Sequence, residues 1–230
     1  MLRIIVILLL TVSNFGSNLL AQSKRDWTWV LGYPTLIPGQ ENTDEYGGMY
    51  MRFTDESVSV EKFDIFGGPV SATANDEEGN LLFYSNGCSV FNKNNQVMKN
   101  GSDINEGEAD FDFECNTFKG YSFVGSGTLC LPVPSKESLH YLLYLKIVKT
   151  DDSSFVFQNL VLTEVDMAGE NGTGEVLNKN QIILTDSLQD AVAACRHGNG
   201  RDWWIIIPRG RNRAFWKLLI TPEGIQEKTL

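Results

Sequence analysis

Residues 75–101 read NDEEGNLLFYSNGCSVFNKNNQVMKNG, a series of short apolar runs separated by polar turns. The run LLFYS is bounded on both sides by Asn and Gly, residues that favour tight turns. It is apolar almost throughout, which is the pattern of a strand covered on both faces. The segment therefore predicts short antiparallel strands in a sheet that packs between two other layers.

The same order of elements returns twice further along the chain. A small-residue strand, a polar turn and a strongly apolar strand occur in GTLCLPVPSKESLHYLLYL and again in AVAACRHGNGRDWWIII. The apolar strands begin at Leu81, Tyr141 and Trp203, so they recur after 60 and 62 residues. A recurrence of this length, with about four strands per unit, is typical of β-propeller blades. We expect an all-β fold, a partial β-propeller of about three blades with four antiparallel strands each.

A β-sandwich is the alternative, because it also uses short strands and turns. Sandwich strands usually alternate between apolar and polar residues, and the three apolar strands do not. A ring of about three blades cannot close, and its last sheet would expose an apolar face. We therefore expect residues 23–230 to be the front part of a longer propeller, with its remaining blades as partners.

The first 22 residues have the pattern of a secretory signal peptide. Arg3 supplies the positive charge, residues 4–10 are an unbroken apolar run, and cleavage is expected after Ala21 or Gln22. A transmembrane anchor is the alternative, but a span needs about 20 apolar residues. We expect a secreted or cell-surface protein with no membrane span in the mature chain.

The composition is that of a globular protein, with 42% hydrophobic residues and a formal net charge of −10. So acidic a chain is not expected to bind nucleic acid through its overall field.

Four cysteines in an exported chain indicate two disulfides, for which three pairings exist. Cys88 starts a strand and Cys115 lies in the long connection that follows, so their bridge would pin an acidic loop. Cys130 and Cys195 occupy corresponding places in the inner strands of consecutive blades, so we expect them to form the second pair.

Three segments resemble a known group of proteins: GNLLFYSNGCSVFNKNNQVMKNGSDINEGE, LCLPVP with YLLYL, and RHGNGRDWWIIIP. They are similar to the N-terminal propeller region of large secreted proteins of Bacteroidetes-type bacteria, many of which end in a type IX secretion sorting domain. The resemblance covers the chain from about Trp29 to Ile225. It implies an exported propeller at the cell surface or in the medium, and it implies no established reaction.

Candidate ligand-binding residues are few. The loop SDINEGEADFDFEC carries six carboxylates that suit calcium, so calcium is the one cofactor to consider, and the proposed ligands are Asp110, Asp112 and Glu114. An acidic surface loop is the alternative. The candidate contacts for a protein or glycan ligand are His197, Arg209, Arg211 and Arg213, each of which also fits an ordinary turn.

The sequence favours a recognition or scaffold module without catalytic activity of its own. A secreted carbohydrate-active hydrolase or lyase is the first alternative, using carboxylates of the 103–114 loop. A calcium-dependent adhesin segment is the second. The enzyme hypothesis requires that Asp110, Asp112, Glu114 and His197 converge in one cleft.

Overall fold

The computed structural model describes residues 23–32, 48–63, 71–105, 115, 127–151, 155–210 and 213–229, and it is all-β. Its strands form four antiparallel sheets, called sheets 1 to 4 in chain order. Sheet 1 holds β1 (Thr28–Leu31), β2 (Met49–Phe53) and β3 (Val58–Lys62), and sheet 2 holds β4 (Ala72–Asn75), β5 (Leu81–Ser85) and β6 (Val90–Asn92). Sheet 3 holds β7 (Thr128–Pro132), β8 (Leu139–Lys149), β9 (Phe155–Asp166) and β10 (Glu175–Leu188). Sheet 4 holds β11 (Ala193–Arg196), β12 (Trp203–Pro208), β13 (Phe215–Thr221) and β14 (Gly224–Thr229).

Every sheet is a meander, in which each strand pairs with its neighbour along the chain. The three predicted apolar strands are β5, β8 and β12, and they lie in three different sheets. Strands β2 and β3 form a hairpin. Val97 makes only an isolated bridge to Phe91, so sheet 2 has three strands among the described residues and not the expected four.

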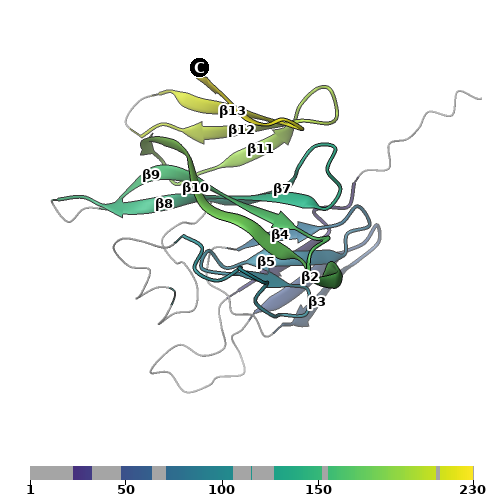
Figure 1. The fold of residues 1–230 in the computed structure, drawn as a ribbon. Helices are drawn as coiled ribbons and strands as arrows, with labels where there is room; N and C mark the ends of the chain where they lie inside the picture. The colour runs from purple at the N-terminus through teal and green to yellow at the C-terminus, as the bar shows by residue number, and fades with distance from the viewer. Residues whose placement is uncertain are drawn as a thin grey trace, which may run out of the picture.

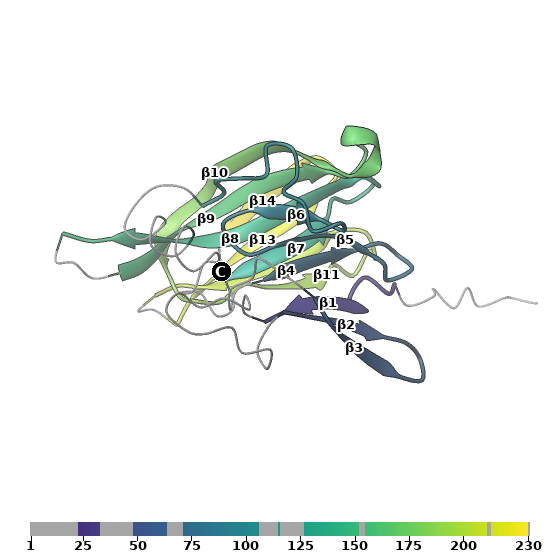
Figure 2. The same cartoon turned by 90° about the horizontal axis from the view of Figure 1, so that it is seen from below.

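The four sheets are stacked face to face in chain order, from sheet 1 at the bottom of Figure 1 to sheet 4 at the top. Seen from below in Figure 2, the strands of sheets 2 to 4 overlie one another, while β2 and β3 project to one side. A hydrophobic cluster fills each gap between consecutive sheets. Examples from sheet 1 upward are Val30 with Tyr84, Phe83 with Leu142, and Leu143 with Ile205.

Strand β8 shows why the apolar runs do not alternate with polar residues. Successive side chains of a strand point to opposite faces. Leu143 and Leu145 therefore face sheet 4, while Leu142 and Tyr144 face sheet 2, and all four are buried. Because sheet 3 is covered on both sides, both sets of side chains must be compatible with burial.

The first strands of sheets 2, 3 and 4 run in the same direction, since each leads into a turn at the same end of the stack. Strand β4 lies beside β7, and both are rich in small residues, as predicted. Strand β1 also lies beside β4, but it runs the opposite way: Thr28 donates to the carbonyl of Gly79, while Val30 N–H donates to the Thr73 hydroxyl. Sheet 1 therefore covers the free face of sheet 2 without repeating the direction of the other three.

The far side of sheet 4 carries apolar side chains that no other described sheet covers. Ile205 and Ile207 of β12 point into the cluster between sheets 3 and 4. Trp204 and Ile206 must then point away from it, and both are only half-buried. Leu219 and Phe215 of β13 share that side by their pairing with β12, and Phe215 is 44% exposed. We call these four residues the outer face of sheet 4.

The cysteines agree with one of the two predicted pairs. Cys88 and Cys115 form a disulfide with a Cα–Cα distance of 5.6 Å. The prediction of a Cys130–Cys195 bridge is wrong, because both are free thiols. Cys130 packs in the cluster between sheets 2 and 3, whereas Cys195 is exposed and pairs with Trp204, which points away from sheet 3. Corresponding positions in the sequence thus point to different sides of their sheets.

Candidate functional site

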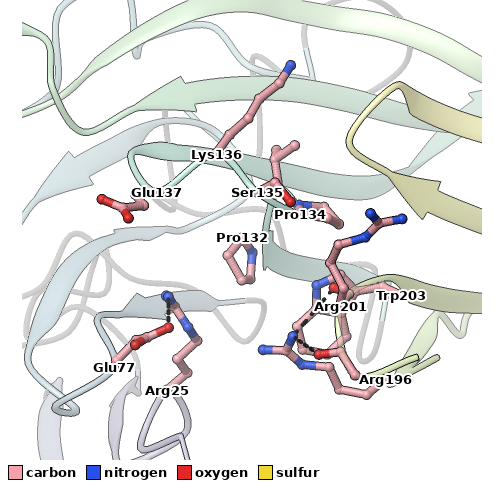
Figure 3. Close-up of a pocket in the computed structure, with 12 residues that line it drawn as sticks. Arg25, Glu77, Pro132, Pro134, Ser135, Lys136, Glu137, Arg196, Arg201 and Trp203 are labelled. Carbon is pink, nitrogen blue, oxygen red and sulfur yellow. Dashed lines mark hydrogen bonds and ion pairs between the residues drawn. The ribbon is translucent and has the colours of Figure 1, made fainter. Parts of the chain in front are cut away.

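A pocket of about 300 Å³ lies at one end of the stack, where equivalent turns of three sheets meet (Figure 3). These turns, at 76–80, 133–138 and 197–202, each join the first strand of a sheet to its second strand. Glu77, the segment 132–137, and Gly200 with Arg201 line the pocket from them. Arg25, Arg196 and Trp203 complete it, and we call it the turn pocket.

Local hydrogen bonds fix the first and third of these turns. In the 76–80 turn, Asp76 Oδ1 accepts the N–H groups of Glu78 and Asn80. Gly79 has a φ of 87°, and an added Cβ would meet that of Trp27 at 2.9 Å, so glycine is required there. In the 197–202 turn, Asn199 Oδ1 accepts the N–H groups of Arg201 and Asp202. Side-chain oxygens thus accept hydrogen bonds from backbone N–H groups that have no backbone partner in the turn.

The middle turn has a serine where glycine is expected. Lys136 N–H donates to the carbonyl of Val133, with Pro134 at the second position and Ser135 at the third. Ser135 has a φ of 58°, the left-handed conformation that a type II turn demands at that position and that glycine adopts most easily. The side chain of Ser135 lines the turn pocket. A non-glycine residue in this conformation stores strain of about 1 kcal/mol, and such residues gather at ligand sites.

Two arginines face the turn pocket from opposite sides, with Pro132 between them (Figure 3). Arg25 donates from Nη1 to the carbonyl of Asn75 at 3.0 Å and from Nη2 to Glu77 Oε1 at 3.2 Å. Arg196 lies with its guanidinium carbon 4.2 Å from the centre of the Trp203 ring and donates from Nη1 to the carbonyl of Gly200 at 3.0 Å. These contacts hold both guanidinium groups in place before any ligand binds.

The charge of the turn pocket is opposite to that of the chain. Its lining carries the cations Arg25, Lys136, Arg196 and Arg201 against the acids Glu77 and Glu137. Arg201 is already paired with Asp202, and Arg25 with Glu77. Lys136 and Arg196 form no ion pair with the described carboxylates. Burial and the nearby charge of Arg25 both lower the pKa of Arg196, so the two guanidinium groups are close enough to repel each other.

A second hollow, of about 340 Å³, runs along the first strands of sheets 1, 2 and 3. Small polar side chains line most of it, among them Thr28, Thr73 and Thr128, together with the free thiol residue Cys130. Arg25 borders both hollows. The second hollow lacks the paired cations of the turn pocket.

The predicted contact residues do not gather in the turn pocket. His197 lies in the 197–202 turn but is not among the residues that line the pocket; its Nδ1 accepts the N–H of Asn199 at 3.1 Å and its ring lies 5.2 Å from that of Trp204. Arg209 donates from Nε to Asp186 Oδ2 at 2.6 Å in a partly buried ion pair. Arg213 is exposed in the connection between β12 and β13, and Arg211 lies outside the described residues. No described contact joins His197 to Arg209.

The predicted calcium ligands Asp110, Asp112 and Glu114 also lie outside the described residues. Within the described part of the chain, no three His, Cys, Asp or Glu side chains are grouped as a metal site would require. The same residues include no helix with the length and apolar character to cross a membrane.

No family model, no curated protein and no solved structure matches this chain. The site must therefore be judged by its own geometry and chemistry.

Sequence reasoning missed Arg25, Ser135 and Arg196. The signal that could have found two of them is the repeat itself, because the turn after each small-residue strand must lie at the same end of a stack of meanders. Comparing these turns would have brought Ser135 and Arg196 together. Nothing in the repeat predicts Arg25, which precedes the first sheet and reaches the pocket because β1 runs opposite to β4.

Proposed function

We propose that the chain is part of an exported bacterial β-propeller and recognises a ligand in the turn pocket, without catalytic activity of its own. The observation that carries this proposal is that equivalent turns of three consecutive sheets build one pocket. Loops on a rigid scaffold are the usual place for binding residues. The pocket therefore lies where a binding site formed jointly by the repeated turns is expected.

The arrangement of sheets 2, 3 and 4 supports the propeller. All three are meanders whose first strands run the same way, and β4 and β7 lie side by side. The apolar second strands β5 and β8 lie between layers, as stacked blades require, whereas β12 is covered by a described sheet on one side only. Sheet 1 takes the place of a neighbouring blade on the free side of sheet 2, although its direction is reversed.

We further propose that a fifth sheet of the same propeller covers the outer face of sheet 4. Trp204 and Ile206 lie on this face at positions flanking Ile205, which is fully buried against sheet 3. Lys217 and Gln226 share this side by their strand pairing, but Trp204, Ile206, Leu219 and Phe215 form an apolar patch on it, and such patches commonly mark contact surfaces. Contact with the remaining blades therefore suits the outer face better than exposure to water does.

Export rests on the N-terminal pattern. Intact-mass measurement of the protein recovered from the medium or cell surface of a bacterial host should show removal of residues 1–21 or 1–22. Retention of these residues in the exported protein would contradict the signal-peptide assignment.

The recognition function can be tested by blocking the pocket. Glu137 is exposed and lines the turn pocket, so Glu137→Trp should fill it without disturbing the core. We expect a glycan and peptide array to give at least one ligand that wild-type protein binds and Glu137→Trp loses. The matched control is Arg213→Trp, which adds the same side chain to an exposed loop at the other end of β12 and should keep binding.

The same ligand should be recovered unchanged after long incubation with the protein, as chromatography and mass spectrometry can show. Cleavage products would favour the hydrolase or lyase alternative. Binding that both tryptophan variants retain would place the site elsewhere on the molecule.

A further inference from the structure

The geometry points to a carboxylate group as the feature that the turn pocket recognises, held between Arg196 and Arg25 with Lys136 at the rim. This inference rests on the proposed recognition function and adds the chemical class of the ligand.

The first reason is the shape of the donors. A guanidinium group is planar and offers parallel N–H groups that match the two oxygens of a carboxylate. Arg196 uses its Nη1 for the carbonyls of Gly200 and Arg201, and its guanidinium forms no other hydrogen bond with the described residues. Its Nε and Nη2 therefore remain as donors for a ligand.

The second reason is the unbalanced charge. Arg25 and Arg196 face one pocket, and neither Arg196 nor Lys136 has a carboxylate partner among the described residues. Glu77, which is paired with Arg25 and also attracts Arg196, offsets part of the repulsion between the two guanidinium groups, and a ligand anion between them would offset more of it. In a chain of net charge −10 this local excess of cations is not a by-product of the composition.

The third reason limits the ligand to one negative group. Glu77 and Glu137 line the same pocket and would repel a ligand with charges along its length. A volume of about 300 Å³ is at the lower end for ligand pockets, enough for one sugar ring or two small residues. The remaining lining includes Pro132 and Val133, which can contact an uncharged part of the ligand.

Two sources of such a carboxylate exist at a cell surface, an acidic sugar and the C-terminus of a peptide. Four probes separate them: methyl glucuronoside against methyl glucoside, and N-acetyl-glycyl-glycine against its amide. Each is titrated into the full chain by calorimetry at low salt, with inorganic phosphate as a further anion.

We expect one or both acids to bind at least tenfold more tightly than their neutral partners. Binding of the glucuronoside identifies an acidic sugar, and binding of the peptide acid identifies a C-terminus. Raising the salt concentration should weaken the interaction, because it depends on charge.

Variants locate the binding. Arg196→Gln should lower the affinity at least tenfold, and Arg196→Lys should recover only part of it because lysine lacks the planar fork. Lys93→Gln removes the same charge from an exposed turn outside the pocket and should leave the affinity unchanged. Thermal melting of each variant verifies that the fold is intact.

The inference is overturned if neutral probes bind as well as the acids, if phosphate alone binds, or if no acid binds at 10 mM, a concentration on the scale of very weak ligands. These outcomes differ from failure of the recognition function. If a neutral ligand from the array binds the wild-type protein but not Glu137→Trp, the recognition function is supported and the carboxylate inference is contradicted.

Discussion

Trp216 Nε1 donates a 2.7 Å hydrogen bond to Asp186 Oδ2, and this bond joins β13 of sheet 4 to β10 of sheet 3. Arg209 Nε donates to the same oxygen at 2.6 Å, and its guanidinium lies 5.2 Å from the Trp216 ring. A single carboxylate thus holds two residues of the neighbouring sheet. Arg209 therefore helps to fix one sheet against the next, and its contact with a ligand stays a prediction.

Replacing Asp186 should loosen the contact between sheets 3 and 4. Asp186→Ala leaves the donors of Trp216 and Arg209 without their acceptor, and we expect a loss of about 1–3 kcal/mol in the free energy of unfolding. Urea denaturation measures this value. Asp55→Ala removes an acid from the exposed turn between β2 and β3 and should change stability by less. Equal effects of the two variants would show that the inter-sheet bond contributes nothing.

His140 should make the fold sensitive to mild acid. Its side chain is buried against Phe83, its Nδ1 donates to the carbonyl of Ser138, and its Nε2 has no hydrogen-bond partner among the described residues. The pKa of His140 is lowered from its usual 6.5 to about 4, mainly by burial, which outweighs the hydrogen bond to Ser138; the smaller effects of Arg25 and Asp166 lower and raise the pKa, respectively. The neutral ring is therefore the form that fits the folded protein.

The sign of the pH effect follows from proton binding. Between pH 6.5 and pH 4 the unfolded chain binds a proton at His140 that the folded chain does not, so stability should fall as the pH falls. The loss amounts to about 3 kcal/mol at most, at about 1.4 kcal/mol per pH unit. Urea denaturation at pH 7.5 and pH 4.5 measures it. His140→Leu should reduce the difference, whereas His197→Gln, at the second of the chain's two histidines, should keep it.

The disulfide should contribute to stability more than either free thiol. Cys88 and Cys115 close a loop with a sequence separation of 27, for which the loop-closure entropy corresponds to about 3–4 kcal/mol. Thermal melting of Cys88→Ala/Cys115→Ala should show a clear loss of stability. Cys195→Ala should have little effect because Cys195 is exposed and free. A double variant as stable as wild type would contradict the assignment.

The outer face of sheet 4 should make the chain self-associate, because no other described sheet covers it. Exposed apolar patches of this kind mark contact surfaces. Sedimentation velocity should show oligomers that grow with concentration, and Ile206→Glu should shift them toward monomer. Val60→Glu, at a residue 58% exposed on the hairpin of sheet 1, is the matched control and should not. A monomer at all concentrations would indicate that this face does not require a covering layer.

Much of the local structure was predicted from the sequence. The strand at Leu81–Ser85 has the predicted bounds because Asn and Gly mark both of its ends. The apolar strands β5 and β8 were recognised because burial on both faces removes alternation, which is a local signal; β12 shows the same pattern although a described sheet covers only one of its sides. The bridge between Cys88 and Cys115 was also predicted, from a strand start and the loop that follows it.

The site residues chosen from the sequence stay predictions. His197 and Arg209 were selected as binding residues because they lie in turns, and within the structure they contact Asn199 and Asp186. A turn sequence does not show which of its side chains its own backbone and the neighbouring sheet will use. Asp110, Asp112 and Glu114 lie outside the described residues, so the calcium hypothesis stays a prediction.

The sequence by itself determined where the strands and turns occur, because turn residues and apolar runs act over a few neighbouring positions. The tertiary structure decided which side of each sheet a residue faces and which distant residues meet. Cys130 and Cys195 failed to pair because they face opposite ways in their sheets. Arg25 and Arg196 line the same pocket because β1 is antiparallel to β4. Packing between whole sheets sets this direction, and no local sequence pattern does.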